Sequence, residues 1–363
     1  MGFRCGIIGL PNVGKSTIFN ALTAAGAQVA NYPFCTIDPN VGIVRVPDAR
    51  LDRIAAVVNP PKKTCTTMEF FDIAGLVKGA SRGEGLGNKF LGHIRDVEAL
   101  VHIVRCFENP DVVHVSGEVD PAGDIEIVNT ELLLADLETV ERRLEKSEKL
   151  LRQGDKSAVK EVQVLQQIKD QLGRGVPARI GGWDNALESL KDLNLLTAKR
   201  VLYVANVSET VLKSGNGYIR KVEEYASREQ ARSIVICGDL EAEIAELPEE
   251  ERKAFLEDLG LKESGLEKLI RTGYELLGLI TFYTTVGPEL RAWTVRQGTR
   301  APVAAGKIHS DMERGFIRAE VLHYTDFIRA GSLAAARDEG LIRSEGKEYI
   351  IQDGDIVLFR FNV

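Results

Sequence analysis

The sequence predicts an α/β protein in which a three-layer domain is interrupted by a helical hairpin and followed by a small α+β domain. The first hundred residues alternate strand-like and helix-like segments, the pattern of a sheet covered by helices on both faces. Two apolar stripes at helical spacing then flank a turn signal at Gly154-Asp155. From Thr281 onward, short strand-like runs alternate with brief helical ones, which favours a separate small domain.

The three-layer domain is predicted from short buried runs that alternate with helical or irregular segments. Residues 15–25 form the first expected helix, and the irregular stretch 30–40 after it carries two prolines. Pro248 suits the start of the helix that follows it. The expected strands are residues 4–9, 41–46, 68–71, 99–104, 200–206 and 233–237, and the expected closing helices are 249–259 and 265–277.

A helical hairpin is predicted between residues 104 and 200. Glu, Lys and Arg fill most positions outside its two apolar stripes, which is typical of solvated helix faces. Because expected strands resume after it, the hairpin is an insertion into the three-layer domain. We therefore expect three parts: a domain of residues 1–128 and 198–278, the hairpin of residues 129–197, and a C-terminal domain of residues 279–363. The stripes are Leu133, Leu137, Val140, Leu144 and Leu151, then Val162, Leu165, Ile168 and Leu172.

The C-terminal domain is predicted from short elements of both kinds. Strands and helices mixed over about eighty residues favour an α+β domain with segregated helices. The expected strands include residues 291–295, 316–322 and 355–361, and the expected helices are 302–308 and 332–338.

The composition is that of a soluble globular protein. With 44% hydrophobic and 27% charged residues, the 363-residue chain can bury more than one core. A formal charge of −7 argues against a surface devoted entirely to nucleic acid, although local basic patches remain compatible with it. Five cysteines without a CxxC pair fit a reducing compartment, and no apolar run approaches transmembrane length. We therefore expect a cytoplasmic protein.

A phosphate-binding loop is predicted at residues 6–17, Gly-Ile-Ile-Gly-Leu-Pro-Asn-Val-Gly-Lys-Ser-Thr, which match GxxxxGK[ST]. The match lies between an apolar run and a helical segment, so a strand, a glycine-rich turn and a helix N-terminus are expected in order. The glycines let several N–H groups point at one anion, and the helix start adds the positive end of its dipole. We expect Lys15 to contact the β- and γ-phosphates and the Ser16 hydroxyl to bind Mg²⁺.

A metal and γ-phosphate element is predicted where residues 72–75, Asp-Ile-Ala-Gly, follow an expected strand. The Asp72 carboxylate can hold Mg²⁺ through water, and the N–H of Gly75 can meet the γ-phosphate. Octahedral Mg²⁺ favours few, hard oxygen ligands. In the preceding irregular loop, Thr36 is the leading second ligand, ahead of its rivals Thr23, Thr64, Thr66 and Thr67.

The group that positions the attacking water is not evident. Leu76 follows the Asp-x-x-Gly element where related switches carry a glutamine, and leucine cannot orient water. His114 is a candidate, with a structural histidine as the alternative; His93 and His102 are weaker ones. The side chain of Asn12 could help to bind a monovalent cation such as K⁺, or it could cap the turn.

The nucleotide base is predicted from residues 206–209, Asn-Val-Ser-Glu, which follow an expected strand. Guanine-specific relatives use Asn-Lys-x-Asp there, but Val207 replaces the lysine and the longer Glu209 replaces the aspartate. Misplaced partners for guanine N–H groups weaken its recognition strongly. The Asn206 amide could pair with adenine N6 and N7, so ATP is favoured.

Together these residues resemble the Obg-related P-loop NTPases, and among them the Obg-like ATPases of the YchF subfamily. The motifs that carry the resemblance are Gly9–Thr17, Asn31–Thr36, the glycine-rich stretch Asp72–Ile94 and Asn206–Glu209. The C-terminal residues resemble a TGS domain, which has a β-grasp fold. These are Arg291–Arg296, His309–Phe316 and Gln352–Asp355.

The resemblance implies an ATP-preferring hydrolase that uses Mg²⁺ bound by Ser16 and Thr36 and turns over slowly without assistance. It further implies that the backbone of Val207 contacts adenine and that ribosomes are partners. The residues implied to hold the phosphates are Asn12, Val13, Gly14, Lys15, Ser16 and Thr17.

An RNA-binding edge is expected in the C-terminal domain. Residues 291–310 hold Arg291, Arg296, Arg300 and Lys307 but no Asp or Glu, and Trp293 offers a ring for stacking. The helical hairpin could contact RNA or other proteins. Two rival functions remain: a GTP-driven translation factor, and an adaptor in which bound ATP orders the glycine-rich loop and hydrolysis is incidental.

Overall fold

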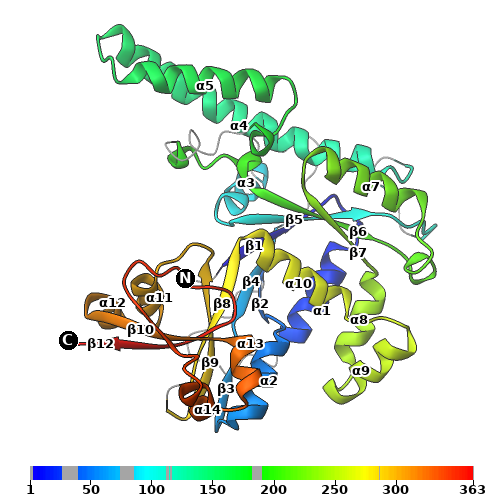
Figure 1. The fold of residues 1–363 in the computed structure, drawn as a ribbon. Coiled ribbons are helices and arrows are strands. Elements are labelled where there is room, and N and C mark those ends of the chain that lie inside the picture. Colours follow the sequence, from blue (N-terminus) through cyan, green and yellow to red (C-terminus); the bar gives the residue numbers. More distant parts are fainter. Residues whose placement is uncertain are drawn as a thin grey trace. The chain divides into compact units, whose positions relative to one another are not determined.

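The computed structural model describes residues 3–26, 40–73, 86–111, 114, 117–181, 190–285 and 287–362. The chain divides into two units (Figure 1). Unit 1 comprises residues 1–44 and 69–269, and unit 2 comprises residues 45–68 and 270–363.

Unit 1 is built on a six-stranded sheet in the order β2-β4-β1-β5-β6-β7. The pairs β4-β1, β1-β5, β5-β6 and β6-β7 are all parallel. Every residue of β5 is buried, as expected for a strand covered on both faces. The strands are β1 (Arg4–Ile8), β2 (Val41–Arg45), β4 (Thr67–Asp72), β5 (Ala99–Arg105), β6 (Arg200–Asn206) and β7 (Arg232–Ile236).

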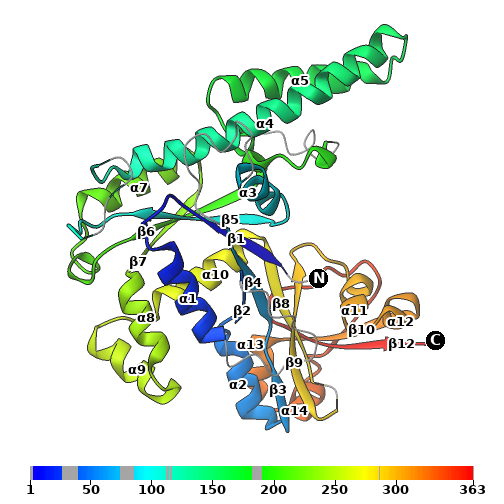
Figure 2. The same cartoon turned by 180° about the vertical axis from the view of Figure 1, so that it is seen from behind.

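Helices cover both faces of this sheet, as the sequence predicts. In Figures 1 and 2, α4 (Pro121–Arg152) and α7 (Gly217–Arg228) lie on one face, and α1 (Lys15–Gly26) and α8 (Gly238–Glu246) lie on the other. The remaining helices of this part of the chain are α3 (Leu86–Arg95), α9 (Glu249–Asp258) and α10 (Gly265–Leu276), with short 3₁₀ turns at 178–180, 191–193, 196–198 and 209–211.

The predicted hairpin consists of α4 and α5 (Ala158–Gly173), which pack through a shared apolar cluster. Its helices turn at Gly154, whose φ of 95° is in the left-handed region that favours glycine. The expected boundary at residues 128/129 lies inside α4, because the N-terminal half of this helix buries Ile125 and Val128 within unit 1. The first helix of the hairpin is therefore the C-terminal part of α4, whose N-terminal part is buried in unit 1.

Unit 2 contains a second six-stranded sheet in the order β11-β10-β12-β8-β9-β3. Its strands are β3 (Lys62–Thr64), β8 (Leu279–Thr284), β9 (Glu289–Arg296), β10 (Phe316–His323), β11 (Arg343–Glu345) and β12 (Asp355–Phe361). Its helices are α2 (Ala49–Val58), α11 (Ala301–Ile308), α12 (Ser310–Arg314), α13 (Tyr324–Ala330) and α14 (Leu333–Asp338).

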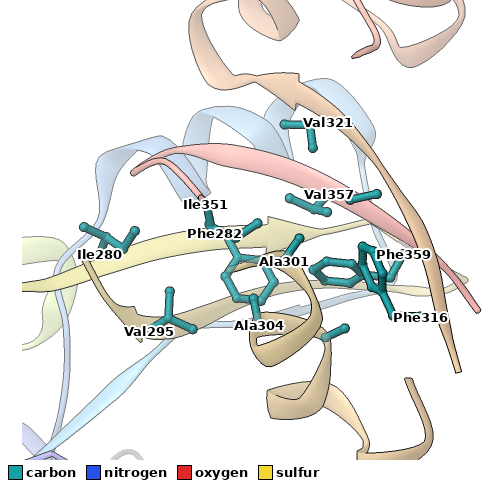
Figure 3. Close-up of a cluster of buried hydrophobic side chains, with 12 residues drawn as sticks. Ile280, Phe282, Val295, Ala301, Ala304, Phe316, Val321, Ile351, Val357 and Phe359 are labelled. Atoms are coloured by element: carbon teal, nitrogen blue, oxygen red, sulfur yellow. The ribbon is translucent and has the colours of Figure 1, made fainter. Parts of the chain in front are cut away.

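Each face of this second sheet has its own apolar core. One core joins strand residues to α11; Figure 3 shows Phe316 and Phe359 side by side within it, with ring centroids 6.2 Å apart. The other core joins Leu322 and Ile356 to residues of α2, α13 and α14. The predicted α+β domain is thus present.

Residues 45–68 belong to unit 2, whereas the sequence-based division assigned them to the N-terminal domain. The reason is long-range pairing: β3 pairs in parallel with β9, with Thr64 opposite Arg291. Leu51 and Ile54 of α2 complete one of the two cores. The sequence-based division placed these short elements with their neighbours in the chain, because their pairing partners lie more than two hundred residues away.

Candidate nucleotide-binding site

The phosphate-binding loop connects β1 to α1, as its sequence pattern predicts. Gly14 has a φ of 87°, and a Cβ at this position would lie 2.1 Å from Nδ2 of Asn206, so no other residue fits. A Cβ at Gly9 would lie 2.6 Å from the carbonyl oxygen of Ile103. Both glycines are therefore required by close approach to a neighbouring strand, which fixes the curvature of the loop.

The first turn of α1 carries no acidic residue. Ser16 is exposed there and Thr17 is half-buried. The positive end of the helix dipole is thus not offset by a carboxylate on the helix itself. An anion can approach this helix end, and the exposed hydroxyl of Ser16 can reach a cation that the anion carries.

Lys15 and Asp72 form an ion pair at the end of two neighbouring strands. The parallel pairing of β1 with β4 sets Ile7 opposite Asp72, so the carboxyl end of β4 reaches the start of the phosphate-binding loop. The side chains of Lys15 and Asp72 are 10% and 21% exposed, so solvent still reaches the pair. The structure brings together the two charged residues that the sequence assigned to phosphate and metal.

Asn206 braces the site through both ends of its amide. Its Nδ2 donates to the carbonyl oxygen of Val13 at 2.9 Å, and its Oδ1 accepts from the N–H of Gly238 at 2.9 Å. The side chain is almost fully buried. The sequence predicted that this amide would read the base; in the structure it ties the phosphate-binding loop to the turn between β7 and α8.

The base-recognition segment continues from Asn206 into buried and then exposed positions. Val207 is buried, and its N–H donates to the carbonyl oxygen of Ile236 at 2.9 Å. Glu209 is exposed and begins a 3₁₀ turn.

The remaining residues of the predicted phosphate loop differ in their exposure. Val13 is 1% exposed and contributes its backbone to the site. Asn12 is exposed, with a φ of 63° in the left-handed region that asparagine tolerates better than most residues. Its backbone conformation is therefore consistent with a turn-forming role. Thr36, Gly75 and Leu76 lie outside the described residues.

His114 is buried beside the N-terminal turn of α4. Its Nε2 lies 3.0 Å from Oδ2 of Asp124, and their side chains are 5% and 3% exposed. Burial raises the pKa of the Asp124 carboxyl, an effect that its hydrogen bond to His114 opposes. A carboxylate can orient an imidazole for catalysis, but the same pair can also serve packing alone.

The turn between β7 and α8 is a part of the site that the sequence analysis missed. Cys237 precedes α8, and Gly238 donates to Asn206 while lying close to Ile18 of α1. A glycine directly after the apolar run 233–237 was the available signal. Without the fold, nothing indicated that this turn closes against the phosphate-binding loop.

The expected RNA-binding edge of unit 2 is largely engaged in contacts within that unit. Arg291 lies over the ring of Trp293 at 4.1 Å, and Arg300 pairs with Glu348 at 3.1 Å. Arg296 donates to the carbonyl oxygen of Leu277 at 3.2 Å. Each of these three arginines therefore already has a partner within unit 2.

None of the helices among the described residues is both long enough and apolar enough to cross a bilayer.

Two family models match the chain. Residues 4–132 match a model described as a 50S ribosome-binding GTPase, and residues 279–362 match the C-terminal YchF-GTPase model, described as a protein of unknown function.

Curated relatives match the whole chain. The protein named ribosome-binding ATPase YchF of Bacillus subtilis is 56% identical, with both chains covered completely. Its namesakes in Escherichia coli O157:H7 and Mycoplasma genitalium are 51% and 46% identical, over 100% and 99% of both chains.

A solved structure entitled as the YchF GTPase of Schizosaccharomyces pombe has a TM-score of 0.90 and 38% sequence identity. The match covers 99% of this chain and 98% of that one. Its fold therefore includes both the P-loop domain and the C-terminal domain found here. This structural match, together with sequence identities of 56% and 51% to curated YchF proteins over the whole chain, shows that the chain belongs to the YchF family.

Proposed function

We propose that this protein is a Mg²⁺-dependent ATPase that acts in the cytoplasm as a nucleotide-controlled switch on the ribosome. The observation that carries the proposal is the contact between Lys15 and Asp72 at the N-terminus of α1. An ammonium group that can bind phosphate and a carboxylate that can hold a metal, in contact at one helix start, are two of the parts that phosphoryl transfer requires. The proposed role on the ribosome is supported by the curated relatives, which are named ribosome-binding ATPases.

Preference for ATP is supported by the chemistry of residues 206–209. The Asn206 amide is already bonded to Val13 and Gly238, so the base would meet the backbone of the next residues. We propose that the backbone of Val207 contacts adenine. The exposed Glu209 is one methylene longer than the aspartate that pairs with guanine. The longer carboxylate misplaces the partner of the N1 and N2 donors of guanine, so recognition of adenine is favoured.

A GTP-driven factor remains the second candidate function. The solved structure with a TM-score of 0.90 is entitled a GTPase, whereas the curated relatives are named ATPases. The family name thus leaves the base open, and a direct comparison of nucleotides is required.

The residues present fit a magnesium ion. The donors near the helix start are the hydroxyl of Ser16 and the carboxylate of Asp72, and both are hard oxygen ligands of the kind that Mg²⁺ prefers. We propose that Ser16 and Thr36 bind the ion directly and that Asp72 holds it through water. When bound, Mg²⁺ neutralises charge that develops on the phosphates. A K⁺ ion near Asn12 is a further part of the proposal.

The chain's own residues would then work as follows. Lys15 leaves Asp72 to bind the β- and γ-phosphates, the backbone from Asn12 to Thr17 cradles them, and Gly75 contacts the γ-phosphate. Leu76 cannot orient the attacking water. His114, whose ring Asp124 orients, is the candidate for that task.

The test is calorimetric titration of the purified protein with ATP and with GTP, each with and without Mg²⁺, in K⁺ or in Na⁺. We expect ATP to bind more tightly than GTP and Mg²⁺ to strengthen binding. Co-sedimentation with ribosomes in ATP, in ADP and without nucleotide then tests the switch. Failure to bind any adenosine nucleotide would overturn the proposal, and tighter GTP binding would favour the second candidate.

A further inference from the structure

One face of the sheet in unit 2 is covered along only part of its length. Side chains of β10 and β12 alternate between the faces, and Phe316, Ala319 and Phe359 enter the core that Figure 3 shows. On the opposite face, Leu322 and Ile356 are covered by α2, α13 and α14. Further along the same two strands, Arg318, Glu320 and Arg360 line a groove.

The open part of this face is a groove of about 530 Å³ that we call the arginine groove. Four arginines and one carboxylate account for all its charged lining residues: Arg318, Arg337, Arg343, Arg360 and Glu320. The side chains of Arg318, Arg343 and Arg360 are 49–54% exposed, so solvent reaches all three. These side chains come from three adjacent strands and from α14, which gives the groove a rigid floor.

The positive charges in the arginine groove are only partly balanced within the protein, since its lining holds four arginines and one glutamate. Arg318 and Arg360 are directly opposite each other in the pairing of β10 with β12, and like charges at such positions are destabilising. Glu320 alone lies between them: it accepts two bonds from Arg360, at 3.0 and 3.1 Å, and one from Arg318 at 3.3 Å. Arg343 lies 3.6 Å from Glu345, which does not line the groove, and its guanidinium donates to the hydroxyl of Tyr349 at 3.2 Å.

The excess of guanidinium groups defines the chemistry of the partner. Guanidinium binds phosphate through two parallel hydrogen bonds and remains charged at any physiological pH. A ligand with several negative charges in a row would relieve the repulsion between these arginines, so such a ligand should bind most tightly. Since no lining residue of the groove is aromatic, contact with phosphates is favoured over stacking of bases.

We propose that the arginine groove binds the phosphate backbone of RNA and is the RNA-contacting surface of unit 2. The proposal rests on the ribosome binding argued above and replaces the expected edge at residues 291–310 by a different face of the same sheet. Binding there is independent of base sequence, and it weakens with salt because counterions are released when phosphates are neutralised.

The test compares two sets of variants of the full chain. The groove variant is Arg318→Gln, Arg337→Gln and Arg343→Gln; Arg360 is kept because it holds Glu320. The control variant is Arg291→Gln, Arg300→Gln and Lys307→Gln, which removes the same charge from the expected edge. The probe is a fluorescein-labelled 20-nucleotide oligouridylate followed by anisotropy from 50 to 200 mM KCl, with ribosome co-sedimentation in parallel.

We expect the groove variant to lose at least tenfold in affinity for the RNA and in the fraction bound to ribosomes. Each lost contact to a single strand should reduce the salt slope by about 0.7, so three contacts reduce it by about 2. The control variant should retain the affinity and slope of the unchanged protein. Arg→Lys replacements at the same three positions should keep most of the salt slope while losing part of the affinity.

Other outcomes overturn the proposal. One is a groove variant that keeps the RNA affinity of the unchanged protein, and another is a loss of RNA affinity in the control variant alone. A third is displacement of RNA from the unchanged protein by poly-glutamate at equal charge, which would indicate an acidic protein partner. An unaltered affinity for ATP and an unaltered midpoint of thermal unfolding show that a variant is folded. If the triple groove variant does not fold, the single Arg337→Gln variant replaces it in the test. Absence of ribosome binding by the unchanged protein would instead contradict the proposed function.

Discussion

The side-chain amide of Asn206 donates to the carbonyl oxygen of Val13 at 2.9 Å, so the end of β6 is bonded directly to the phosphate-binding loop. The other end of the amide accepts from Gly238. One buried side chain therefore holds three loops of the nucleotide site in register. The shape of the phosphate cradle depends on a residue that sequence alone assigns to base recognition.

Replacing Asn206 should weaken both the fold and the binding of nucleotide. In Asn206→Ala, the carbonyl of Val13 and the N–H of Gly238 lose their partner in a buried place, which costs about 1–3 kcal/mol. Urea unfolding measures the loss, and calorimetry with ATP measures the accompanying loss of affinity. Ser208→Ala, at a half-buried neighbour, should stay within about 0.5 kcal/mol. A variant that loses affinity at unchanged stability would contradict the bracing role.

The ion pair between Lys15 and Asp72 predicts opposite effects for its two members. Lys15→Ala should reduce ATP affinity by about 10- to 150-fold, the equivalent of 1.5–3 kcal/mol for a charge-assisted hydrogen bond. Asp72→Asn should leave Mg²⁺-free ATP binding equal or tighter, because it removes a negative charge and frees Lys15. It should also abolish the strengthening by Mg²⁺.

Calorimetry with ATP, with and without Mg²⁺, checks both variants. The control is Asp52→Asn, which removes the same charge at an exposed site that pairs with Lys63. Weaker Mg²⁺-free binding by Asp72→Asn would show that the carboxylate supports phosphate binding in some other way.

The pair of His114 and Asp124 predicts a loss of stability when the imidazole is removed. His114→Ala leaves the buried carboxylate without this hydrogen bond, at a cost of about 1–3 kcal/mol in unfolding free energy. The double variant His114→Ala, Asp124→Ala should recover part of that loss. If His114 also orients the attacking water, ribosome-stimulated kcat falls by about 10²-fold or more at unchanged ATP affinity; unchanged kcat removes it from catalysis.

Burial of His102 predicts a dependence of stability on pH. Burial, followed by the charge of Arg179, lowers the pKa of His102 from 6.5 to about 3. Between these values the unfolded chain binds the proton and the folded chain does not. Stability contributed by neutral His102 is complete above pH 6.5 and falls as the pH is lowered towards 3, by up to about 1.4 kcal/mol per pH unit.

The difference in unfolding free energy between the unchanged protein and His102→Phe isolates this contribution, since other groups titrate alike in both. Urea unfolding at pH 7, 6 and 5 should show the variant gaining relative to the unchanged protein as the pH falls. Parallel curves for the two proteins would contradict the prediction.

Strong local patterns made much of the fold predictable. The phosphate-binding motif fixed the end of the first strand and the start of α1 to within a residue, and the strands at 200–206 and 355–361 have the predicted limits. Continuous apolar runs mark buried strands without reference to the rest of the chain. The hairpin was equally evident, since its apolar stripes repeat over several turns.

Other elements depend on distant partners and gave no local signal. Strand β3 is three residues long, polar for most of its length, and exists because β9 pairs with it. Strand β8 is wholly buried, but it follows a predicted helix closely and was not predicted as a strand. The double role of the Asn206 amide likewise requires loops that are adjacent only in the folded protein.

Residues 45–68 carry a practical consequence for dissecting the protein. A truncation at residue 278 would leave α2 and β3 attached to a fragment that lacks β9 and the rest of their core, and residues 279–363 alone would lack Leu51 and Ile54. Neither half is a self-sufficient folding unit. The last eighty or so residues must be synthesised before α2, near the start of the chain, can be buried. Expressing the chain as two fragments divided after residue 278 should therefore yield aggregates and not two folded domains.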